Sequence, residues 1–173
     1  MSEKPLVGIV LGSRSDKEHA FRMGKILEEL EVAYEVTISS AHRTPEDVVS
    51  YSSSCRQRGI CVIIAVAGLS AALPGVIAAH TDLPVIGVPV ASGTLGGMDA
   101  LLSVAQMPPG VPVATVGING SRNAAVLAAR ILALGNEGVS KKIRAWTEAQ
   151  KIQVRDSRKE LEGLPAVPED VLS

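Results

Sequence analysis

Apolar runs of strand length recur along the chain, and segments with helical spacing of apolar residues separate them. The runs lie at residues 5–11, 33–38, 62–66, 84–88 and 113–118. Continuous apolar runs are typical of strands that are buried on both faces, as in parallel sheets covered by helices. The pattern therefore predicts a parallel sheet built from these segments.

The intervening segments have the character of helices. After Ser15 and Asp16, apolar residues return at the spacing of an amphipathic helix, at Ala20, Met23, Leu27 and Leu30. Residues 44–47, Thr-Pro-Glu-Asp, supply a capping residue, a first-turn proline and two acids for a second helix. Further helices are expected near residues 74–80, 98–105 and 122–134. This alternation predicts an α/β fold with helices on both faces of the sheet.

The segment after Gly138 differs from the rest of the chain. Residues 139–161 are charged and helix-favouring, and no strand follows to which such a helix would cross over. The helix is expected to pack on the outside of the domain or to reach a neighbouring subunit. We predict one α/β domain over residues 1–138, a C-terminal helix over 139–162 and a frayed tail over 163–173.

Composition narrows the class of protein. A chain of 173 residues suits one domain, and a net charge of −1 gives no field that would recruit nucleic acid or an anionic membrane. No apolar run is as long as a membrane span, and the N-terminus lacks the features of a signal peptide. Cys55 and Cys61 lack the partners of a zinc site, so we expect reduced core thiols in a cytoplasmic protein. Ala-rich helices hint at faces buried in an oligomer.

The loops that follow the first four strands are rich in glycine and serine. In open parallel sheets these loops meet at one edge, where ligands bind, and exposed amides and hydroxyls at helix starts form anion sites. Arg14 and Arg43 lie in two of the loops, so we expect a phosphorylated small ligand. The alternative is that these residues only turn the chain and cap helices. The chain has neither the Gly-x-x-x-x-Gly-Lys of a P-loop nor the three glycines of a dinucleotide site.

His42 is the histidine that lies at a strand–helix junction. One interpretation is a solvated loop residue. Beside Arg43 and a phosphate pocket it is also suited to acid–base chemistry, because an imidazole exchanges protons near neutral pH. Asp16 is the nearest candidate acid, and it can accept hydrogen bonds from ligand hydroxyls such as those of a ribose. His19 and His80 are expected to be surface groups.

Four motifs occur in order: Gly-Ser-x-Ser-Asp at 12–16, Ser-Ala-His-Arg-Thr-Pro at 40–45, Gly-Val-Pro-Val at 87–90 and Gln-Met-Pro-x-Gly-Val-Pro at 106–112. With them, the chain from Leu6 to Leu134 resembles the N5-carboxyaminoimidazole ribonucleotide mutase family of purine biosynthesis, whose members are also described as the catalytic subunit of phosphoribosylaminoimidazole carboxylase. The resemblance implies a three-layer α/β/α sandwich with a parallel, flavodoxin-like sheet and an extra C-terminal helix. It also implies a homo-octamer with active sites where subunits meet.

The resemblance also implies roles for individual residues. His42 would be the general acid–base, Ser13 and Arg43 would bind the 5′-phosphate of the substrate, and Asp16 would hold its ribose hydroxyls. A cavity lined by small residues, including 92–97, would exclude water. The implied substrate-binding residues are Ser13, Ser15, Asp16, Ser40, Ala41, Arg43, Gly68 and Leu73.

The implied reaction moves a carboxylate from the exocyclic amine of an aminoimidazole ribonucleotide to ring carbon C4. No metal, nucleotide or biotin cofactor is implied, because the substrate carries the carboxylate. Ala72 is a departure, since many bacterial mutases have a histidine there, and its loop partly resembles related carboxylases that use CO₂ directly. Arg43 and the segments 87–89 and 107–110 resemble the mutases instead. A direct carboxylase and a non-catalytic phosphoribosyl-binding module remain the alternatives.

Overall fold

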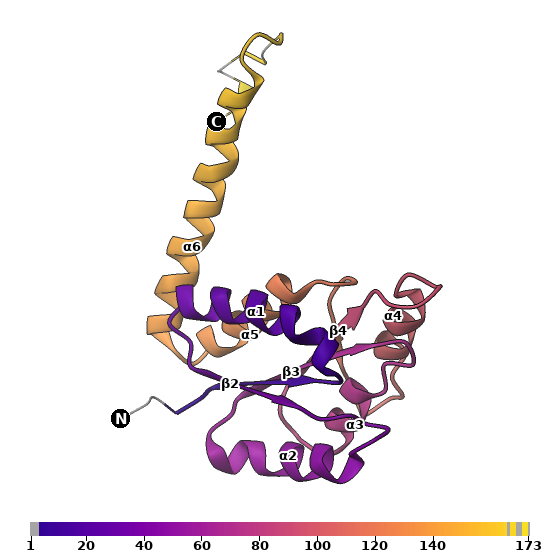
Figure 1. The fold of residues 1–173 in the computed structure, drawn as a ribbon. Helices are drawn as coiled ribbons and strands as arrows, with labels where there is room; N and C mark the ends of the chain where they lie inside the picture. Colours follow the sequence, from indigo (N-terminus) through magenta and orange to yellow (C-terminus); the bar gives the residue numbers. More distant parts are fainter. Residues whose placement is uncertain (1–3, 166, 169–170, 173) are drawn as a thin grey trace.

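A five-stranded parallel sheet lies between two layers of helices (Figure 1). The computed structural model describes residues 4–165, 167–168 and 171–172. The strand order is β2-β1-β3-β4-β5, and each neighbouring pair is parallel. The strands are β1 (Val7–Leu11), β2 (Tyr34–Ile38), β3 (Val62–Gly68), β4 (Val85–Val90) and β5 (Ala114–Thr115). The helices are α1 (Lys17–Glu29), α2 (Pro45–Arg58), α3 (Leu73–Ala79), α4 (Met98–Ala105), α5 (Ser121–Ala133) and α6 (Glu137–Asp156).

The sheet separates two apolar cores, which confirms the predicted fold class. Helices α1 and α5 cover one face, where Met23 and Leu27 pack against the small side chains of Ala124 and Ala128. Helices α2, α3 and α4 cover the other face, around Ile77 and other apolar side chains. Strands β1, β3 and β4 are buried along almost their whole length, as their continuous apolar runs predicted.

Strand β5 is shorter than predicted, because it covers two residues of the expected 113–118. Its contact with β4 continues through Val116 N–H to Gly87 O (3.1 Å) and Asn119 N–H to Pro89 O (2.8 Å). Pro89 has no N–H to donate to this neighbour, so the regular ladder ends there. The last part of the predicted strand is therefore a loop that stays beside β4.

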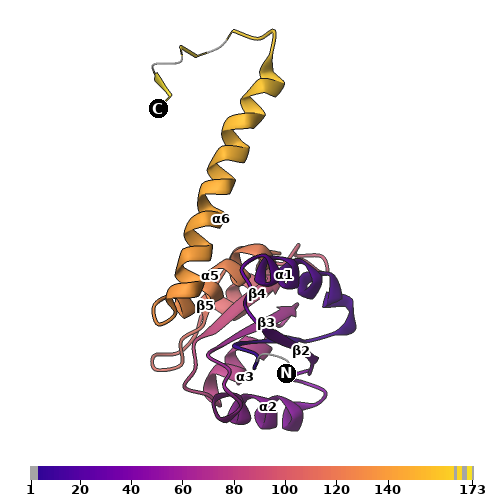
Figure 2. The same ribbon diagram turned by 90° about the vertical axis from the view of Figure 1, so that its left-hand side faces the viewer.

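Helix α6 extends far beyond the sheet (Figures 1 and 2). It starts at Glu137, two residues earlier than predicted, because the Asn136 side chain accepts a hydrogen bond from Val139 N–H (3.1 Å) and caps it. Trp146 Nε1 donates to Glu29 on α1 (3.0 Å), so contacts to the domain are made by the first part of the helix. A 3₁₀ turn, Ser157–Leu161, follows. The predicted tail, 163–173, lies in part outside the described residues, as do residues 1–3.

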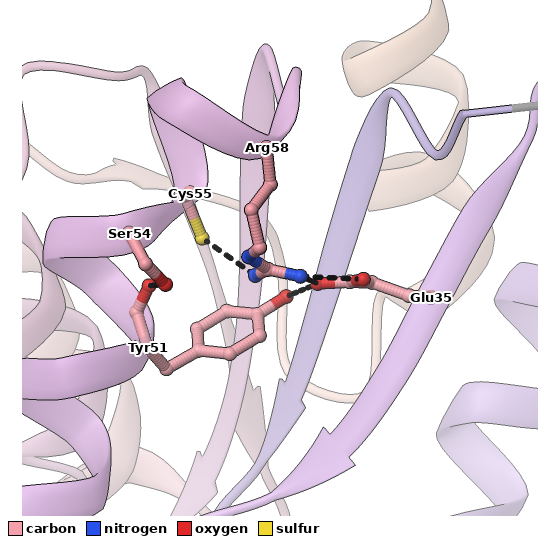
Figure 3. A network of polar contacts seen from close by, with 5 residues as sticks. All are labelled: Glu35, Tyr51, Ser54, Cys55 and Arg58. Carbon is pink, nitrogen blue, oxygen red and sulfur yellow. Dashed lines mark hydrogen bonds and ion pairs between the residues drawn. The ribbon is translucent and has the colours of Figure 1, made fainter.

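A polar network joins edge strand β2 to α2 (Figure 3). Glu35 on β2 accepts a hydrogen bond from the Tyr51 hydroxyl (2.8 Å) and pairs with Arg58 Nη1 (2.6 Å). The Arg58 guanidinium lies over the Tyr51 ring, 5.0 Å from its centroid, and donates to the buried Cys55 thiol (3.6 Å). We call Glu35, Tyr51 and Arg58 the β2–α2 clasp.

The two cysteines are both free, but they differ in burial. Cys55 is buried on α2, as predicted. Cys61 is exposed, so the prediction of a second core thiol is wrong. Cys61 precedes β3, and only from Val62 onwards is that segment enclosed between the helix layers. Within the described residues, no helix has both the length and the apolar character needed to cross a membrane.

Candidate active site

A cavity of about 570 Å³ opens at the carboxyl ends of β1, β2 and β3. In the strand order, β2 lies on one side of β1, whereas β3, β4 and β5 follow one another on its other side. The loops that leave β1 and β3 therefore run to opposite sides and leave a crevice between these two strands. Ligands of open parallel sheets bind at such a point. The residues to which the resemblance gives a catalytic or substrate-binding role all line this cavity: Ser13, Ser15, Asp16, Ser40, Ala41, His42, Arg43, Gly68 and Leu73.

The loop after β1 presents Asp16. Gly12 N–H donates to Val66 O (2.9 Å), which holds the loop against β3, and Ser13 caps the following 3₁₀ turn through its Oγ and Ser15 N–H (3.4 Å). Asp16 is buried, and its carboxylate accepts a hydrogen bond from Ser15 Oγ (3.3 Å). Burial raises the pKa of Asp16, while the Ser15 hydroxyl and the nearby His19 oppose the rise. The cavity thus contains a carboxylate that has lost much of its water.

The loop after β2 folds so that Arg43 reaches back to β1. Arg43 Nη2 donates to Gly12 O (3.3 Å) and its Nε donates to Ser40 Oγ (3.3 Å). Thr44 occupies the capping position of α2, but its hydroxyl accepts from Ser40 N–H (3.0 Å) rather than from the helix. The threonine therefore closes the loop, and Pro45 begins the helix as predicted. Both of these hydrogen-bond partners are neutral oxygens. The positive charge of the Arg43 guanidinium is therefore not paired with a carboxylate of the described residues, and an anion can bind to it.

His42 is exposed at the mouth of the cavity. No described residue forms a hydrogen bond with its ring. Its neighbours in sequence, Ala41 and Arg43, also line the cavity. An imidazole placed this way is free to meet a ligand, because no residue between 4 and 165 bonds with either of its nitrogens.

The β3–α3 loop forms the apolar wall. Gly68 lies close to the next loop: a Cβ there would come 2.6 Å from Ser92 Oγ, so the serine side chain would have to move to accept one. Leu69 has a left-handed backbone, with φ of 55°, an uncommon conformation in a side-chain-bearing residue that is concentrated at functional sites. Ala71 and Leu73 are buried, and Ala72 also lines the cavity. This wall carries no ionisable side chain.

The sequence analysis was wrong or silent on three points about the site. Of residues 92–97, only Ser92 lines the cavity, because the later residues turn away into the start of α4. Arg14 does not line the cavity either. His19 was expected at the surface, but it is half-buried and shares a hydrogen bond of 2.5 Å with Ser121. A signal for this existed, since His19 lies one helical turn before Met23 on the apolar face of α1.

The other polar groups do not form a second site of this kind. His80 is exposed at the end of α3, as predicted, and its Nδ1 bonds with Val76 O (2.8 Å). Across the described part of the chain, no group of three or more His, Cys, Asp or Glu side chains is arranged to hold a metal ion.

Comparison with known proteins agrees with this geometry. The family model described as AIR carboxylase matches residues 6–153, most of the chain. The chain belongs to the AIR carboxylase family. The resemblance inferred from the four motifs is thereby confirmed, and the matched residues include the whole cavity lining.

Relatives within the AIR carboxylase family are similar over nearly the full chain. The N5-carboxyaminoimidazole ribonucleotide mutase of Pyrococcus horikoshii is 52% identical over 161 residues, which are 93% of this chain and 91% of the relative. The phosphoribosylaminoimidazole carboxylase of Candida glabrata is 50% identical over 93% of this chain, but the match covers 28% of that longer enzyme. The crystal structure of Treponema denticola PurE superposes with a TM-score of 0.81 at 31% identity, covering 91% of this chain and 99% of that one.

Proposed function

We propose that this chain is an isomerase of purine biosynthesis that converts N5-carboxyaminoimidazole ribonucleotide to 4-carboxy-5-aminoimidazole ribonucleotide. The observation that carries the proposal is the meeting of Asp16, His42 and Arg43 in one cavity at the switch point of the sheet. Relatives at about half identity carry the name of this mutase. The chain thus shares its family, and about half of its residues over most of its length, with proteins that carry the name of this mutase.

The phosphoribosyl part of the substrate is assigned to the polar half of the cavity. Arg43 and Ser13 bind the 5′-phosphate, with Ser40 and the amide near Ala41, because the partners of the guanidinium among the described residues are neutral oxygens. Asp16 accepts hydrogen bonds from the ribose hydroxyls. Its burial makes each such bond valuable, since a desolvated carboxylate gains more from a donor than a hydrated one does.

His42 is assigned the proton transfers. It gives a proton to the exocyclic nitrogen as the N–CO₂ bond breaks, which leaves CO₂ and the neutral amine. Ring carbon C4 then forms a bond with the CO₂, and His42 takes the proton from C4, which restores the aromatic ring. One imidazole therefore completes the cycle unchanged, and the substrate itself supplies the carboxylate.

The apolar wall is assigned the retention of CO₂ between the two steps. Ala71 and Leu73 are buried, and Leu69 and Gly68 close the wall against the Ser92 loop. A wall without ionisable side chains, built largely from apolar ones, holds little ordered water next to the reacting carbon. Ala72 fits this role because its methyl group adds apolar surface where a histidine would add a polar one.

The proposal includes assembly into a homo-octamer in the cytoplasm, with residues 139–162 reaching a neighbouring subunit. Its support is apolar surface that the described chain leaves uncovered. Phe21, Val36 and Ile38 line a groove between α1 and edge strand β2, and each is more than 40% exposed. Ile152 and Val154 are likewise exposed on the outer part of α6. Patches of this kind mark association surfaces.

An ultraviolet assay with two substrates tests the proposal. One sample holds N5-carboxyaminoimidazole ribonucleotide without bicarbonate, and the other holds aminoimidazole ribonucleotide with excess bicarbonate. We expect fast formation of the C4-carboxylated product in the first sample alone. Fast turnover only in the second would establish a direct carboxylase instead, and turnover in neither would contradict the catalytic role of His42.

A further inference from the structure

His19 and Ser121 form a polar contact outside the residues assigned to the substrate. His19 Nδ1 and Ser121 Oγ are 2.5 Å apart, although the two residues are 102 positions apart in sequence. Ser121 is almost completely buried at the first position of α5, and His19 is half-buried in the first turn of α1. The pair therefore ties together the starts of two helices that flank the same end of the sheet.

The rest of the α1–α5 interface is apolar. Met23 and Leu27 lie one and two turns after His19 on the same face of α1, and they pack against alanines of α5. His19 is thus the polar end of an apolar seam, at the end nearest the cavity. The buried Ser121 hydroxyl and the half-buried His19 imidazole satisfy each other's hydrogen-bonding capacity. Removing one of the two side chains would leave the other without this partner, which costs free energy for a buried polar group.

The contact reaches both walls of the active-site cavity. On one side, Asp16 lies three residues before His19 and is close enough for the two side chains to influence each other electrostatically. On the other side, Asn119 lies two residues before Ser121, and its Oδ1 accepts from Ala91 N–H (3.0 Å). Ala91 directly precedes Ser92, which lines the cavity.

A second cavity of about 340 Å³ lies between these two walls. His19, Asn119 and Ala91 line it, and it shares Ser15, Asp16 and Ser92 with the active-site cavity. The space behind Asp16 is therefore open, so packing alone does not hold the Asp16 wall at a set distance from the Ser92 wall. His19 lines this space and Ser121 does not, so the His19–Ser121 bond joins α1 to α5 at the edge of the space.

We propose that His19 is a positioning residue of the active site, which through its bond to Ser121 sets the distance between Asp16 and the Ser92 loop. The proposal rests on the proposed function, because Asp16 is there the group that holds the ribose. His19 does not touch the reacting atoms. It acts on substrate binding, because it keeps the Asp16 carboxylate and the Ser92 loop at a fixed distance from each other.

The charges around His19 support a neutral imidazole in this position. Burial lowers the pKa of His19 and Arg22 lowers it further, while Asp16 and Glu18 raise it. A neutral ring can share one hydrogen bond with the Ser121 hydroxyl at neutral pH in either tautomer. The bond is thus available under the conditions in which the enzyme works.

Three variants separate positioning from simple packing. His19→Leu keeps an apolar side chain at the end of the seam but removes the bond, and Ser121→Ala removes it from the other side. His19→Asn keeps an amide near the position of Nδ1, so it can restore the bond without a titratable group. For each, kcat and KM for N5-carboxyaminoimidazole ribonucleotide, the dissociation constant for ribose 5-phosphate and the melting temperature are measured.

We expect His19→Leu and Ser121→Ala to raise KM and the ribose 5-phosphate dissociation constant by about tenfold, with kcat changed by less than about threefold. His19→Asn is expected to stay within about threefold of wild type in both constants. Unchanged constants in His19→Leu and Ser121→Ala would overturn the proposal. Equal losses in all three variants would overturn it too, because the bond would then not be the cause.

The two constants also separate this proposal from the proposed function. If wild type binds ribose 5-phosphate but turns over neither substrate, the proposed function is wrong, and the affinity changes alone decide the role of His19. If wild type is an active mutase, and KM and the ribose 5-phosphate dissociation constant do not change in His19→Leu and Ser121→Ala, the positioning proposal is wrong and the proposed function stands. Because His19→Leu can lower stability, a loss of affinity in His19→Leu that Ser121→Ala does not share would also overturn the proposal.

Discussion

The β2–α2 clasp and the active-site cavity are both clusters of ionisable side chains, yet their groups are satisfied to very different degrees. In the clasp, Glu35 receives a hydroxyl and a guanidinium, and Arg58 also lies over an aromatic ring (Figure 3). In the cavity, the Arg43 guanidinium bonds with two neutral oxygens and with no carboxylate of the described residues. Paired charges between two elements hold the fold, whereas a cation with spare donors at the strand ends is placed for a ligand.

Among the substitutions in the cavity and the clasp, replacing His42 with asparagine should have the largest effect, and that effect should be on turnover. The assigned proton transfers need an imidazole, so we expect kcat to fall by about 10²- to 10⁴-fold, while the melting temperature stays unchanged. The ultraviolet assay measures the loss. His80→Asn is the matched control, because His80 is also exposed and lies outside the cavity. Activity within tenfold of wild type in His42→Asn would remove His42 from the mechanism.

Arg43→Gln should weaken substrate binding by less than His42→Asn reduces turnover. A charge-assisted bond to phosphate contributes about 1.5–3 kcal/mol, so KM should rise by roughly 10- to 100-fold. Arg14→Gln is the control, since Arg14 lies on the neighbouring loop but does not line the cavity. Equal effects of the two variants on KM would show that general positive charge, rather than the Arg43 position, attracts the substrate.

Glu35→Ala, in the clasp, should lower the stability of the fold rather than activity. It removes the acceptor of Tyr51 and the partner of Arg58, and we expect a loss of about 2 kcal/mol in the free energy of unfolding, discounted for the partial exposure of the pair. Denaturant titration measures this. Asp82→Asn breaks the exposed pair with Arg56 (2.7 Å) and should cost clearly less than Glu35→Ala, because solvent screens both charges. Equal costs would mean that enclosure of the clasp adds nothing.

Asp16→Asn, in the active-site cavity, should change stability in the opposite direction to Glu35→Ala in the clasp. Burial raises the pKa of Asp16 above its ordinary value of 3.8, so the folded state holds the proton more tightly than the unfolded state. The stabilising contribution of Asp16 is therefore complete below 3.8 and is lost as pH rises through the raised pKa. We expect Asp16→Asn to unfold at a higher temperature than wild type at neutral pH but to bind substrate more weakly.

Thermal melts from neutral pH down towards 3.8 check this prediction. The advantage of Asp16→Asn should shrink as the pH falls, because wild-type Asp16 then becomes protonated in the fold. A variant that is less stable than wild type at neutral pH would show that the carboxylate is held by contacts that outweigh its burial. The site would then carry no stability cost for its function.

Local patterns predicted most of the fold, because the signals lie within single elements. The apolar runs of β1, β3 and β4 and the spacing of Met23 and Leu27 need no knowledge of distant residues. Loop composition likewise indicated where the cavity lies, since the carboxyl ends of parallel strands share one edge. What remained hidden depends on pairing across the chain.

Long-range pairs could not be read from one sequence. Glu35 finds Arg58 because the register of β2 and the length of α2 bring residues 23 positions apart together. His19 finds Ser121 over 102 positions for the same kind of reason, so a histidine that looked superficial is half-buried. The early end of β5 is different. Pro89 was visible, but its effect depends on which neighbour its missing N–H would have faced.

The position of Gly8 beneath the Tyr51 hydroxyl has an evolutionary consequence. A Cβ at residue 8 would overlap the hydroxyl oxygen that reaches across β1 to Glu35. A side chain at this point of the strand is therefore tolerated only if the tyrosine is lost or moved as well. In any lineage that keeps this fold, a side chain at residue 8 should therefore occur only where residue 51 has changed or its hydroxyl has left Glu35, whereas Gly8 can persist after Tyr51 is lost.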